Sequence, residues 1–347
     1  MANHTKGRIK KLAGIAATIF VFIIIALAVY NKRPSETKYT RLLMGTVVEI
    51  TLVGGDETGL TSAADAAFDE MQRLEHLLSR YRDDSDVARI NRAAGKEAAV
   101  VSKETMDVIE ASLKVSQYSH GAFDITMGVL GNLWHFTADD RGAMTPPPQQ
   151  EAAKLLPLID YHRIIIDKKN STVKLARPGM KIDLGGIAKG YIVGRAVDVL
   201  KRHGIKKGIV HAGGDMVVFQ EPDDEPWLIG IQDPRNKDRL IGTIKAYNTA
   251  ISTSGDYERF FIKDGVRYHH IMDPSTGFPA NKCRGVTIVA KDSTMADALS
   301  TAIFVLGPDD GMKLIEKLPD AQGLIIDANG RITVSAGLKG KVIFLKQ

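Results

Sequence analysis

The chain has 347 residues, of which 44% are hydrophobic and 25% are charged, so it is long enough to bury one large core or two modest ones. The formal net charge is +5, but four basic residues and no acids among the first thirty positions account for most of it, and the nearly neutral remainder gives no reason to expect a nucleic-acid partner. The single cysteine, Cys283, excludes a disulfide framework within one chain and a metal site made of several thiolates.

Residues 1–30 are predicted to be a membrane anchor or an uncleaved signal. Leu12–Tyr30 is an uncharged, mostly apolar run that would span about 28 Å as a helix, close to the thickness of a bilayer's hydrocarbon core. Basic residues precede the run, which predicts an inner-membrane protein with its body on the periplasmic, extracytoplasmic side. Cleavage after Ala28 stays open as an alternative. Residues 31–40 are expected to form a polar tether, and residues 41–347 the globular domain.

The first half of the globular domain alternates between strand and helix patterns. A strand is predicted over Arg41–Val53, followed by an amphipathic helix over Leu60–Tyr81 whose apolar residues recur at helical spacing. A further helix is predicted over Lys103–Ser119 and a hairpin over Tyr161–Ala176. The last helix of this half ends near His203.

The second half is rich in short strand patterns and also contains two helices, near Thr294–Leu306 and Gly311–Leu318. The strands are predicted at Gly208–His211, Met216–Gln220, Trp227–Gln232, Leu240–Lys245, Ala250–Thr253, Phe260–Ile262, Tyr268–Met272, Val286–Ala290, Gly323–Ile326 and Val342–Leu345. Runs of strands between pairs of helices predict an α+β fold with a largely antiparallel sheet and flanking helices.

The glycine-rich stretch Asp183-Leu184-Gly185-Gly186-Ile187-Ala188-Lys189-Gly190 directs the functional interpretation. Two adjacent glycines let the backbone approach a ligand, and the helix that begins after them directs free N–H groups toward it. Lys189 adds a full positive charge, so a phosphate is the natural ligand. The spacing matches neither the P-loop nor the dinucleotide-binding fingerprint, and taken alone such a stretch is as compatible with a plain helix start.

Asp297 and Thr301 form a second pattern on the helix predicted near Thr294–Leu306. They are four positions apart and share one helix face. A carboxylate and a hydroxyl suit Mg²⁺, which is usually shared with the phosphates of a substrate. Zinc is not favoured, because the histidines lack a helical spacing and cysteine pairs are absent from the sequence. The structural alternative is that Asp297 is only a helix cap.

Taken in order, the motifs resemble the ApbE-type FAD:protein FMN transferases over about residues 40–345. They are Met44-Gly45-Thr46, Leu78-Ser79-Arg80-Tyr81, Gly121-Ala122-Phe123-Asp124, the glycine-rich stretch, Gly213-Gly214-Asp215, Thr253-Ser254-Gly255, His270-Ile271-Met272-Asp273-Pro274 and Asp297-Ala298-Leu299-Ser300-Thr301. The resemblance implies an α+β fold of the T-fold kind. It also implies a Mg²⁺-dependent reaction that moves FMN from FAD to a threonine or serine hydroxyl of a partner flavoprotein and releases AMP.

The resemblance further implies which residues form the site. Flavin contacts are expected at Met44, Tyr81, Ala122, Phe123, Asp124, Asp183, Lys189 and Ile271. Mg²⁺ is expected at Asp297, Thr301 and the carbonyl of Gly186. A catalytic role is implied for His270, chosen over His269 by its place in the motif, because a hydroxyl nucleophile needs a base. Lys189 is expected to stabilise the charge that develops on the phosphates.

The FMN acceptors implied by the resemblance are extracytoplasmic redox flavoprotein subunits, with the membrane reached through the N-terminal helix. Two other functions remain open. One is an FAD pyrophosphatase, in which water replaces the acceptor hydroxyl and FMN and AMP are released. The other is a flavin-binding carrier without turnover, against which the combination of a candidate base and a candidate metal pair argues.

Overall fold

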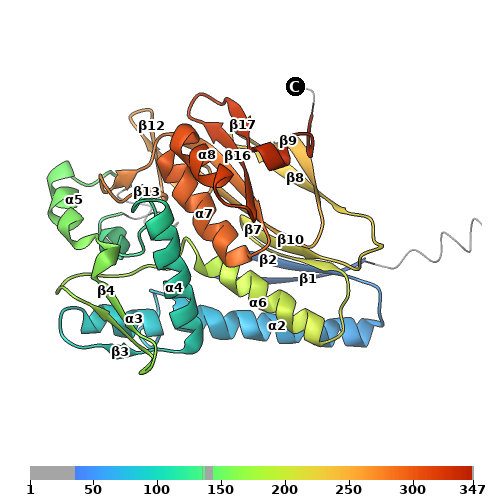
Figure 1. The fold of residues 1–347 in the computed structure, drawn as a ribbon, viewed down its shortest axis with the longest axis horizontal. Coiled ribbons are helices and arrows are strands. Elements are labelled where there is room, and N and C mark those ends of the chain that lie inside the picture. Colours follow the sequence, from blue (N-terminus) through green and yellow to red (C-terminus); the bar gives the residue numbers. More distant parts are fainter. Residues whose placement is uncertain (1–35, 135, 137–143, 346–347) are drawn as a thin grey trace, which may run out of the picture.

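The computed structural model describes residues 36–134, 136 and 144–345 (Figure 1). The segment 1–30, predicted to be an anchor, lies outside these residues. Within the described part of the chain, no helix has both the length and the apolar character that crossing a bilayer requires. The first strand, β1 (Glu36–Leu43), begins inside the range predicted to be a tether, so residues 36–40 belong to the sheet.

The single strand predicted over Arg41–Val53 is wrong, because this segment lies in a hairpin. β1 and β2 (Thr46–Val53) pair antiparallel with Leu43 opposite Thr46, and Met44 and Gly45 form the two-residue turn. Both turn residues have positive φ, 53° and 65°, as the turn type that matches the twist of the strands requires. Methionine is an unusual residue for such a turn, so the sequence pattern did not indicate a break there.

The hairpin forms one edge of an eight-stranded sheet in which every neighbouring pair is antiparallel. The strand order is β1-β2-β6-β7-β10-β15-β16-β17. The further strands are β6 (Gly208–Ala212), β7 (Asp215–Phe219), β10 (Thr249–Gly255), β15 (Cys283–Ala290), β16 (Ala321–Asp327) and β17 (Ile332–Val334). The predicted α+β class with a largely antiparallel sheet is confirmed.

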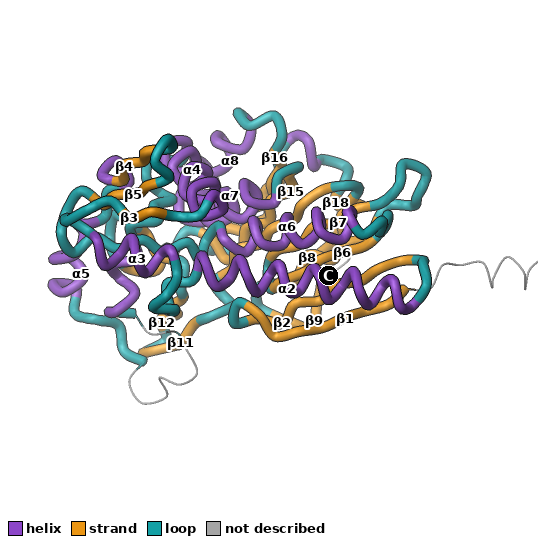
Figure 2. The backbone as a smooth tube through the Cα atoms, turned by 90° about the horizontal axis from the view of Figure 1, so that it is seen from below, coloured by secondary structure: helices purple, strands orange, loops and turns teal. Residues whose placement is uncertain are grey.

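Helices cover one face of this sheet, and α2 and α6 run side by side across it (Figure 2). The helices of this layer are α2 (Glu57–Leu78), α4 (Lys103–Tyr118), α6 (Ala188–Arg202), α7 (Ser293–Leu306) and α8 (Pro308–Glu316). Phe68 and Met71 of α2 and Ile50 and Leu52 of β2 are among the fully buried side chains of this core. Burying each such side chain contributes about 2 kcal/mol.

The opposite face of the main sheet is covered by a three-stranded sheet in the order β18-β9-β8. Its strands are β8 (Trp227–Asp233), β9 (Asn236–Ala246) and β18 (Val342–Phe344). Alternate residues separate the two faces: Ile325 of β16 packs under the helices, whereas its neighbours Leu324 and Ile326 pack against Ile231 and Ile244.

Smaller elements complete the end of the molecule where the site lies. They are α3 (Asp86–Ala93), α5 (Gln149–Leu155), β3 (Ala99–Val100), β4 (Ile164–Asp167), β5 (Thr172–Leu175), β11 (Phe260–Lys263), β12 (Val266–His269), β13 (Met272–Asp273) and β14 (Phe278–Pro279). β4 and β5 confirm the predicted hairpin over Tyr161–Ala176. The strand predicted over Tyr268–Met272 is interrupted at His270 and Ile271, which therefore lie in a bend.

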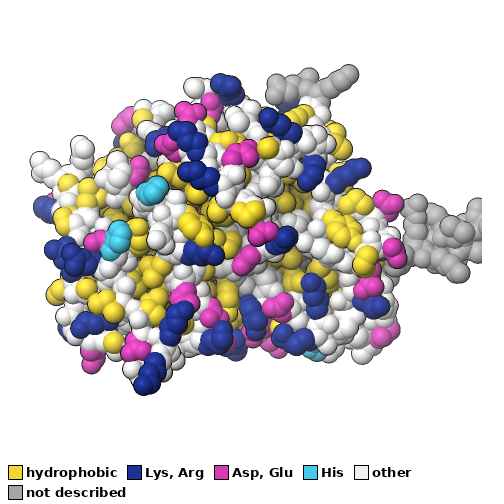
Figure 3. Space-filling view, in the orientation of Figure 1, with side chains coloured by type: hydrophobic (Ala, Val, Ile, Leu, Met, Phe, Trp, Pro, Cys, Tyr) yellow, Lys and Arg dark blue, Asp and Glu magenta, His cyan; other side chains and the backbone are white. Residues whose placement is uncertain are grey.

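Basic and acidic side chains are interspersed over the face shown in Figure 3. This distribution agrees with the nearly neutral charge of the globular domain, and it gives this face a character unlike that of a surface that binds nucleic acid.

Candidate active site

The glycine-rich stretch lies where the start of α6 meets α7. The backbone N–H of Gly190 donates a hydrogen bond to Asp297 Oδ2 at 2.9 Å. A Cβ atom on Gly190 would lie 2.2 Å from the carbonyl oxygen of Ser293 and 2.6 Å from Cβ of Asp297. Glycine is therefore required here for the close approach of two helices, a packing role in addition to the ligand approach predicted from sequence.

The structure brings the three predicted Mg²⁺ residues together. A Cβ atom on Gly186 would lie 3.3 Å from Thr301 Oγ1 and 3.3 Å from Phe123 Cε2, so the loop before α6 packs directly on Thr301. Asp297 lies one turn earlier on α7 and is only 3% exposed. The N-cap of α7 is Asp292, whose side chain accepts from Thr294 and Met295, so Asp297 is not the cap of its own helix.

Lys189 forms an ion pair with Asp215, the first residue of β7. The other oxygen of this buried carboxylate accepts a hydrogen bond from the hydroxyl of Ser252, which lies opposite Asp215 in the β7–β10 register. Sequence reasoning noted Asp215 only as an acid after two glycines. It did not connect Asp215 to Lys189, because that contact depends on how β7 is placed beside α6.

The carboxyl of Asp297 has no ion-pair partner of its own among the described residues. Burial and the negative charge of Asp215 raise the pKa of Asp297. Burial on its own would lower the pKa of Lys189, but the charges of Asp215 and Asp297 raise it above the usual value, so the lysine stays protonated. At a pKa of about 7 the carboxyl of Asp297 takes up a proton readily, and a bound cation would keep it ionised.

Mg²⁺ fits this arrangement. The available donors are oxygens: the carboxylate of Asp297, the hydroxyl of Thr301 and the carbonyl of Gly186. In the described part of the chain, no hydrogen bond is made to Asp297 Oδ1, since the Gly190 amide uses only Oδ2. No cluster of three or more His, Cys, Asp or Glu residues suited to a metal is found among the described residues. The ion would therefore need oxygens from a phosphorylated ligand to complete its shell.

The structure separates the roles of the two adjacent histidines. His269 is 4% exposed, and its ring contacts the carbonyl of Ala280 at 2.7 Å and accepts from the N–H of Ile271 at 3.3 Å. His270 is exposed, and its backbone N–H donates to the carbonyl of Arg259 at 3.1 Å. His269 therefore has a structural role, whereas the ring of His270 is accessible to a ligand.

The surroundings of His270 keep its imidazole neutral. Desolvation by the protein around it, and then the positive charge of Arg259, lower the pKa of His270 below its usual value, and Lys189 acts in the same direction. A neutral imidazole at neutral pH can accept a proton, as a general base must.

Arg80 joins two of the predicted flavin residues. Its Nε lies 3.0 Å from Asp183 Oδ2, and its Nη2 donates to the hydroxyl of Tyr81 at 2.7 Å. The guanidinium lies over the Tyr81 ring, which is 73% exposed and free to stack on a ligand. A Cβ atom on Gly131 would lie 1.7 Å from Arg80 Nη1, so this glycine makes room for the arginine. In the sequence, Arg80 belongs to the motif Leu78-Ser79-Arg80-Tyr81, but its role was not predicted.

Ala122, Phe123 and Asp124 lie in a tight turn next to Asp183. The N–H of Asp183 donates to the carbonyl of Ile125 at 2.8 Å, which connects this turn to the glycine-rich stretch. The carboxylate of Asp124 accepts from the N–H and the hydroxyl of Thr126 and from the N–H of Tyr161. The carboxylate thus holds the turn together. Because the carboxylate is occupied in this way, a flavin would contact the backbone of Asp124.

The predicted residues at the remaining edge of the site are Met44 and Ile271. Met44 is half-buried in the β1–β2 turn, and Ile271 is buried beside His270. A Cβ atom on Gly213, in the turn that precedes Asp215, would lie 3.3 Å from Thr46 Oγ1. The β1–β2 turn therefore touches the turn that holds the partner of Lys189, and the separate clusters form one continuous site.

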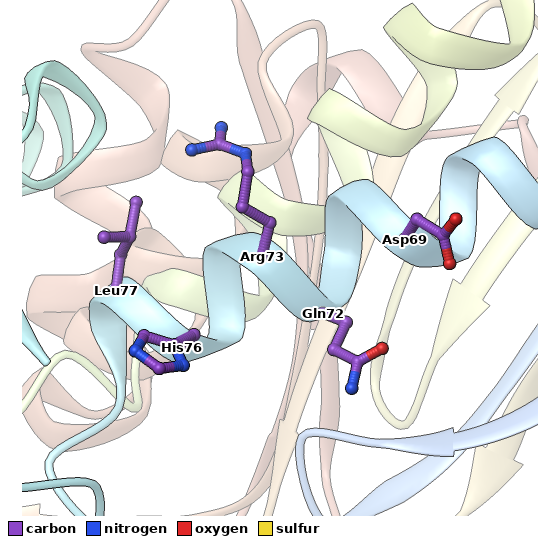
Figure 4. Close-up of a pocket in the computed structure, with 5 residues that line it drawn as sticks. All are labelled: Asp69, Gln72, Arg73, His76 and Leu77. Carbon is purple, nitrogen blue, oxygen red and sulfur yellow. The ribbon is translucent and has the colours of Figure 1, made fainter. Parts of the chain in front are cut away.

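A shallow hollow of about 480 Å³ lies elsewhere, on the exposed surface of α2 (Figure 4). It is lined by Asp69, Gln72, Arg73, His76 and Leu77. The hollow is formed by one helix face and contains none of the predicted site residues, so it is not the candidate active site.

Truncation of Lys189 tests whether this lysine is structural as well as functional. Lys189 neutralises the buried carboxylate of Asp215, so it contributes to the packing of the domain as well as to the ligand site. We expect Lys189→Ala to lower the free energy of unfolding by about 3 kcal/mol, since Asp215 would be left buried without its partner. It should also weaken FAD binding about tenfold or more.

The measurements are urea denaturation and FAD titration, with the exposed Arg202→Ala at the end of α6 as a matched control. Adding Asp215→Asn to Lys189→Ala should restore stability but not affinity. Unchanged FAD affinity in Lys189→Ala would leave the lysine with a purely structural role.

The domain is antiparallel α+β, and its site combines a lysine at a helix start, oxygen-rich acidic side chains and an accessible neutral histidine. These features are typical of an enzyme of phosphate-ester chemistry. The comparisons identify which one, since residues 44–325 match the ApbE family and the chain therefore belongs to that family. An FAD:protein FMN transferase of Treponema pallidum is 33% identical over 93% of this chain and 94% of its own length. A Klebsiella pneumoniae protein of the same name is 33% identical over 86% of this chain and 91% of its own.

Solved structures agree with this assignment. The ApbE protein of Thermotoga maritima superposes with a TM-score of 0.81 at 37% identity, covering 88% of this chain and 99% of its own. The flavin transferase ApbE of Vibrio cholerae gives a TM-score of 0.77 at 30% identity, covering 90% of this chain and 100% of its own.

Proposed function

We propose that the protein is an FAD:protein FMN transferase that moves FMN from FAD to a threonine or serine hydroxyl of an acceptor flavoprotein and releases AMP. The observation that carries this proposal is the accessible His270, kept neutral in the same site as Lys189 and the buried acids Asp215 and Asp297. The names of the relatives from Treponema and Klebsiella support it.

His270 is the group that activates the acceptor. The hydroxyl oxygen attacks the phosphorus on the FMN side of FAD, so a new P–O ester bond forms and the phosphoanhydride bond to AMP breaks. The proton of the hydroxyl moves to a ring nitrogen of His270. A serine or threonine hydroxyl is a weak nucleophile on its own, so a base must take its proton, and only a neutral imidazole can do so.

Lys189 and the first turn of α6 stabilise the charge on the pyrophosphate and on the departing AMP. The ion pair with Asp215 holds the lysine at the helix start, where free N–H groups also point. Asp297, Thr301 and the Gly186 carbonyl would hold Mg²⁺, which when bound neutralises charge on the phosphate oxygens. The metal is part of the proposal because Asp297 is buried near Asp215 and has no ion-pair partner of its own among the described residues.

The flavin would be held by the other side of the site. Tyr81 presents an exposed ring for stacking, and Arg80 fixes its orientation next to Asp183. Met44, Ile271 and the backbone of the 122–124 turn would provide the remaining contacts. This arrangement places flavin recognition on loops, while the phosphate site lies on the start of α6.

The proposed acceptors are extracytoplasmic redox flavoprotein subunits, reached by a body held at the periplasmic face of the inner membrane. The support is the uncharged run Leu12–Tyr30 behind four basic residues. We expect the mature, membrane-extracted protein to retain this segment, as N-terminal sequencing would show. A mature chain that begins at Val29 would contradict the anchor and leave a free enzyme.

The function is tested by incubating the globular domain with FAD, Mg²⁺ and a purified extracytoplasmic flavoprotein subunit. The expected result is flavin fluorescence that stays with the acceptor through denaturing electrophoresis. An acceptor whose modified hydroxyl residue is replaced by valine should stay dark. A fluorescent band in that control, or none with the parent acceptor, would contradict the proposal.

A further inference from the structure

Arg259 lies between two parts of the candidate site and was given no role by the sequence. Its Nη2 is 3.4 Å from the carbonyl oxygen of Gly45, in the β1–β2 turn. Its own carbonyl accepts the backbone N–H of His270 at 3.1 Å. The side chain thus reaches toward Met44 while the backbone positions the candidate base.

The guanidinium of Arg259 is not neutralised. Two buried acids of this region already have partners: Asp215 pairs with Lys189, and Asp256 pairs with Arg235 at 2.7 Å. Within residues 36–134, 136 and 144–345, Arg259 itself forms no ion pair with a carboxylate. One long hydrogen bond to a carbonyl leaves most of the five guanidinium donors free.

Arg259 is exposed and lies near a second cation, an arrangement that favours an anion bound between them. The positive charge of Arg259 opposes protonation of both Lys189 and His270. The β1–β2 turn also fits tightly against it, since a Cβ atom on Gly45 would lie 3.3 Å from Nη2. The guanidinium therefore lies at the β1–β2 turn, within electrostatic reach of both Lys189 and His270.

We propose that Arg259 binds the pyrophosphate of FAD opposite Lys189 and so holds the reacting phosphorus next to His270. This inference rests on the proposed function, because it assigns a further substrate contact within the same site. The ligand chemistry is a nucleoside diphosphate group, for which a planar guanidinium can offer two parallel donors.

The test compares ligands with and without the pyrophosphate in the parent, Arg259→Gln and Arg259→Lys. We expect Arg259→Gln to weaken ADP and FAD binding about tenfold or more and to leave riboflavin binding unchanged. Arg259→Lys should recover part of the loss. Arg267→Gln, a nearby arginine on β12 whose guanidinium lies over Phe260, is the matched control and should change neither affinity.

Equal loss of riboflavin and ADP binding in Arg259→Gln would show a structural effect and overturn the inference. Unchanged ADP affinity in this variant would also overturn it. So would a parent protein that does not bind ADP. These equilibrium measurements need no turnover. A parent that shows the ADP contrast but makes no flavin ester would contradict only the proposed transferase function. If the parent transfers FMN but Arg259→Gln binds ADP as tightly as the parent does, only this inference is contradicted.

Discussion

Asp297→Asn is expected to lower the rate of FMN transfer about a hundredfold or more while the flavin still binds. The substitution keeps the shape of the side chain but removes the charge that would hold Mg²⁺ beside the phosphates. Loss of about 3 kcal/mol of transition-state stabilisation corresponds to this factor. The fold should tolerate the change, since it removes the repulsion between Asp297 and the buried Asp215.

The measurement is the initial rate of acceptor labelling as a function of Mg²⁺ concentration, with FAD affinity determined in parallel. Asp310→Asn replaces an exposed acid of α8 that pairs with Lys313 and serves as the control. Excess Mg²⁺ should restore part of the activity of Asp297→Asn. A normal rate in this variant, or a parent fully active in the presence of a chelator, would show that the metal assignment is wrong.

His270→Ala is expected to reduce transfer by a factor of about 10² to 10⁴, the usual contribution of a positioned base. His270 is exposed and its ring makes no hydrogen bond within the described residues, so the unfolding transition should stay in place. His269→Ala should show the opposite pattern: it leaves the buried carbonyl of Ala280 without its ring partner, which costs about 1–3 kcal/mol of stability. Paired rate and denaturation measurements on the two variants separate a chemical role from a structural one.

The pH dependence of kcat/KM in the parent enzyme is a second test of the role of His270 as a base. Its pKa lies below the usual 6.5, so the neutral form needed to accept a proton persists when the pH falls through that value. The acidic limb of kcat/KM, which reports the free enzyme, should therefore fall below pH 6.5. An acidic limb above pH 7 that disappears in His270→Ala would contradict the assigned environment of the base.

The regular elements were predictable because they depend on local periodicity. The buried face of α2 repeats at helical spacing, and the second half carries runs of short strand patterns between helices, so the α+β class followed from the sequence. The β1–β2 turn was missed because Met44 adopts positive φ without the usual glycine or asparagine signal. The start of β1 was missed because its residues are polar on the exposed face.

The individual residues of the site were predictable in part, but most of the contacts between them were not. Lys189, Asp297 and His270 stood in motifs that could be read along the chain. The ion pair of Lys189 with Asp215 and the hydrogen bond of Ser252 to Asp215 depend on the register between β7 and β10. No sequence spacing determines such contacts, and the structural role of His269 became visible only through its bond to Ala280.

In the proposed reaction an acceptor hydroxyl, rather than water, takes the FMN. The most direct measurement follows AMP release and covalent labelling of the acceptor in one reaction, the first by chromatography and the second by the intact mass of the acceptor. We expect one acceptor-bound FMN, seen as a mass gain of FMN less one water, for each AMP released, and little AMP when the acceptor is omitted. AMP and free FMN formed at the same rate with and without acceptor would contradict it and identify an FAD pyrophosphatase.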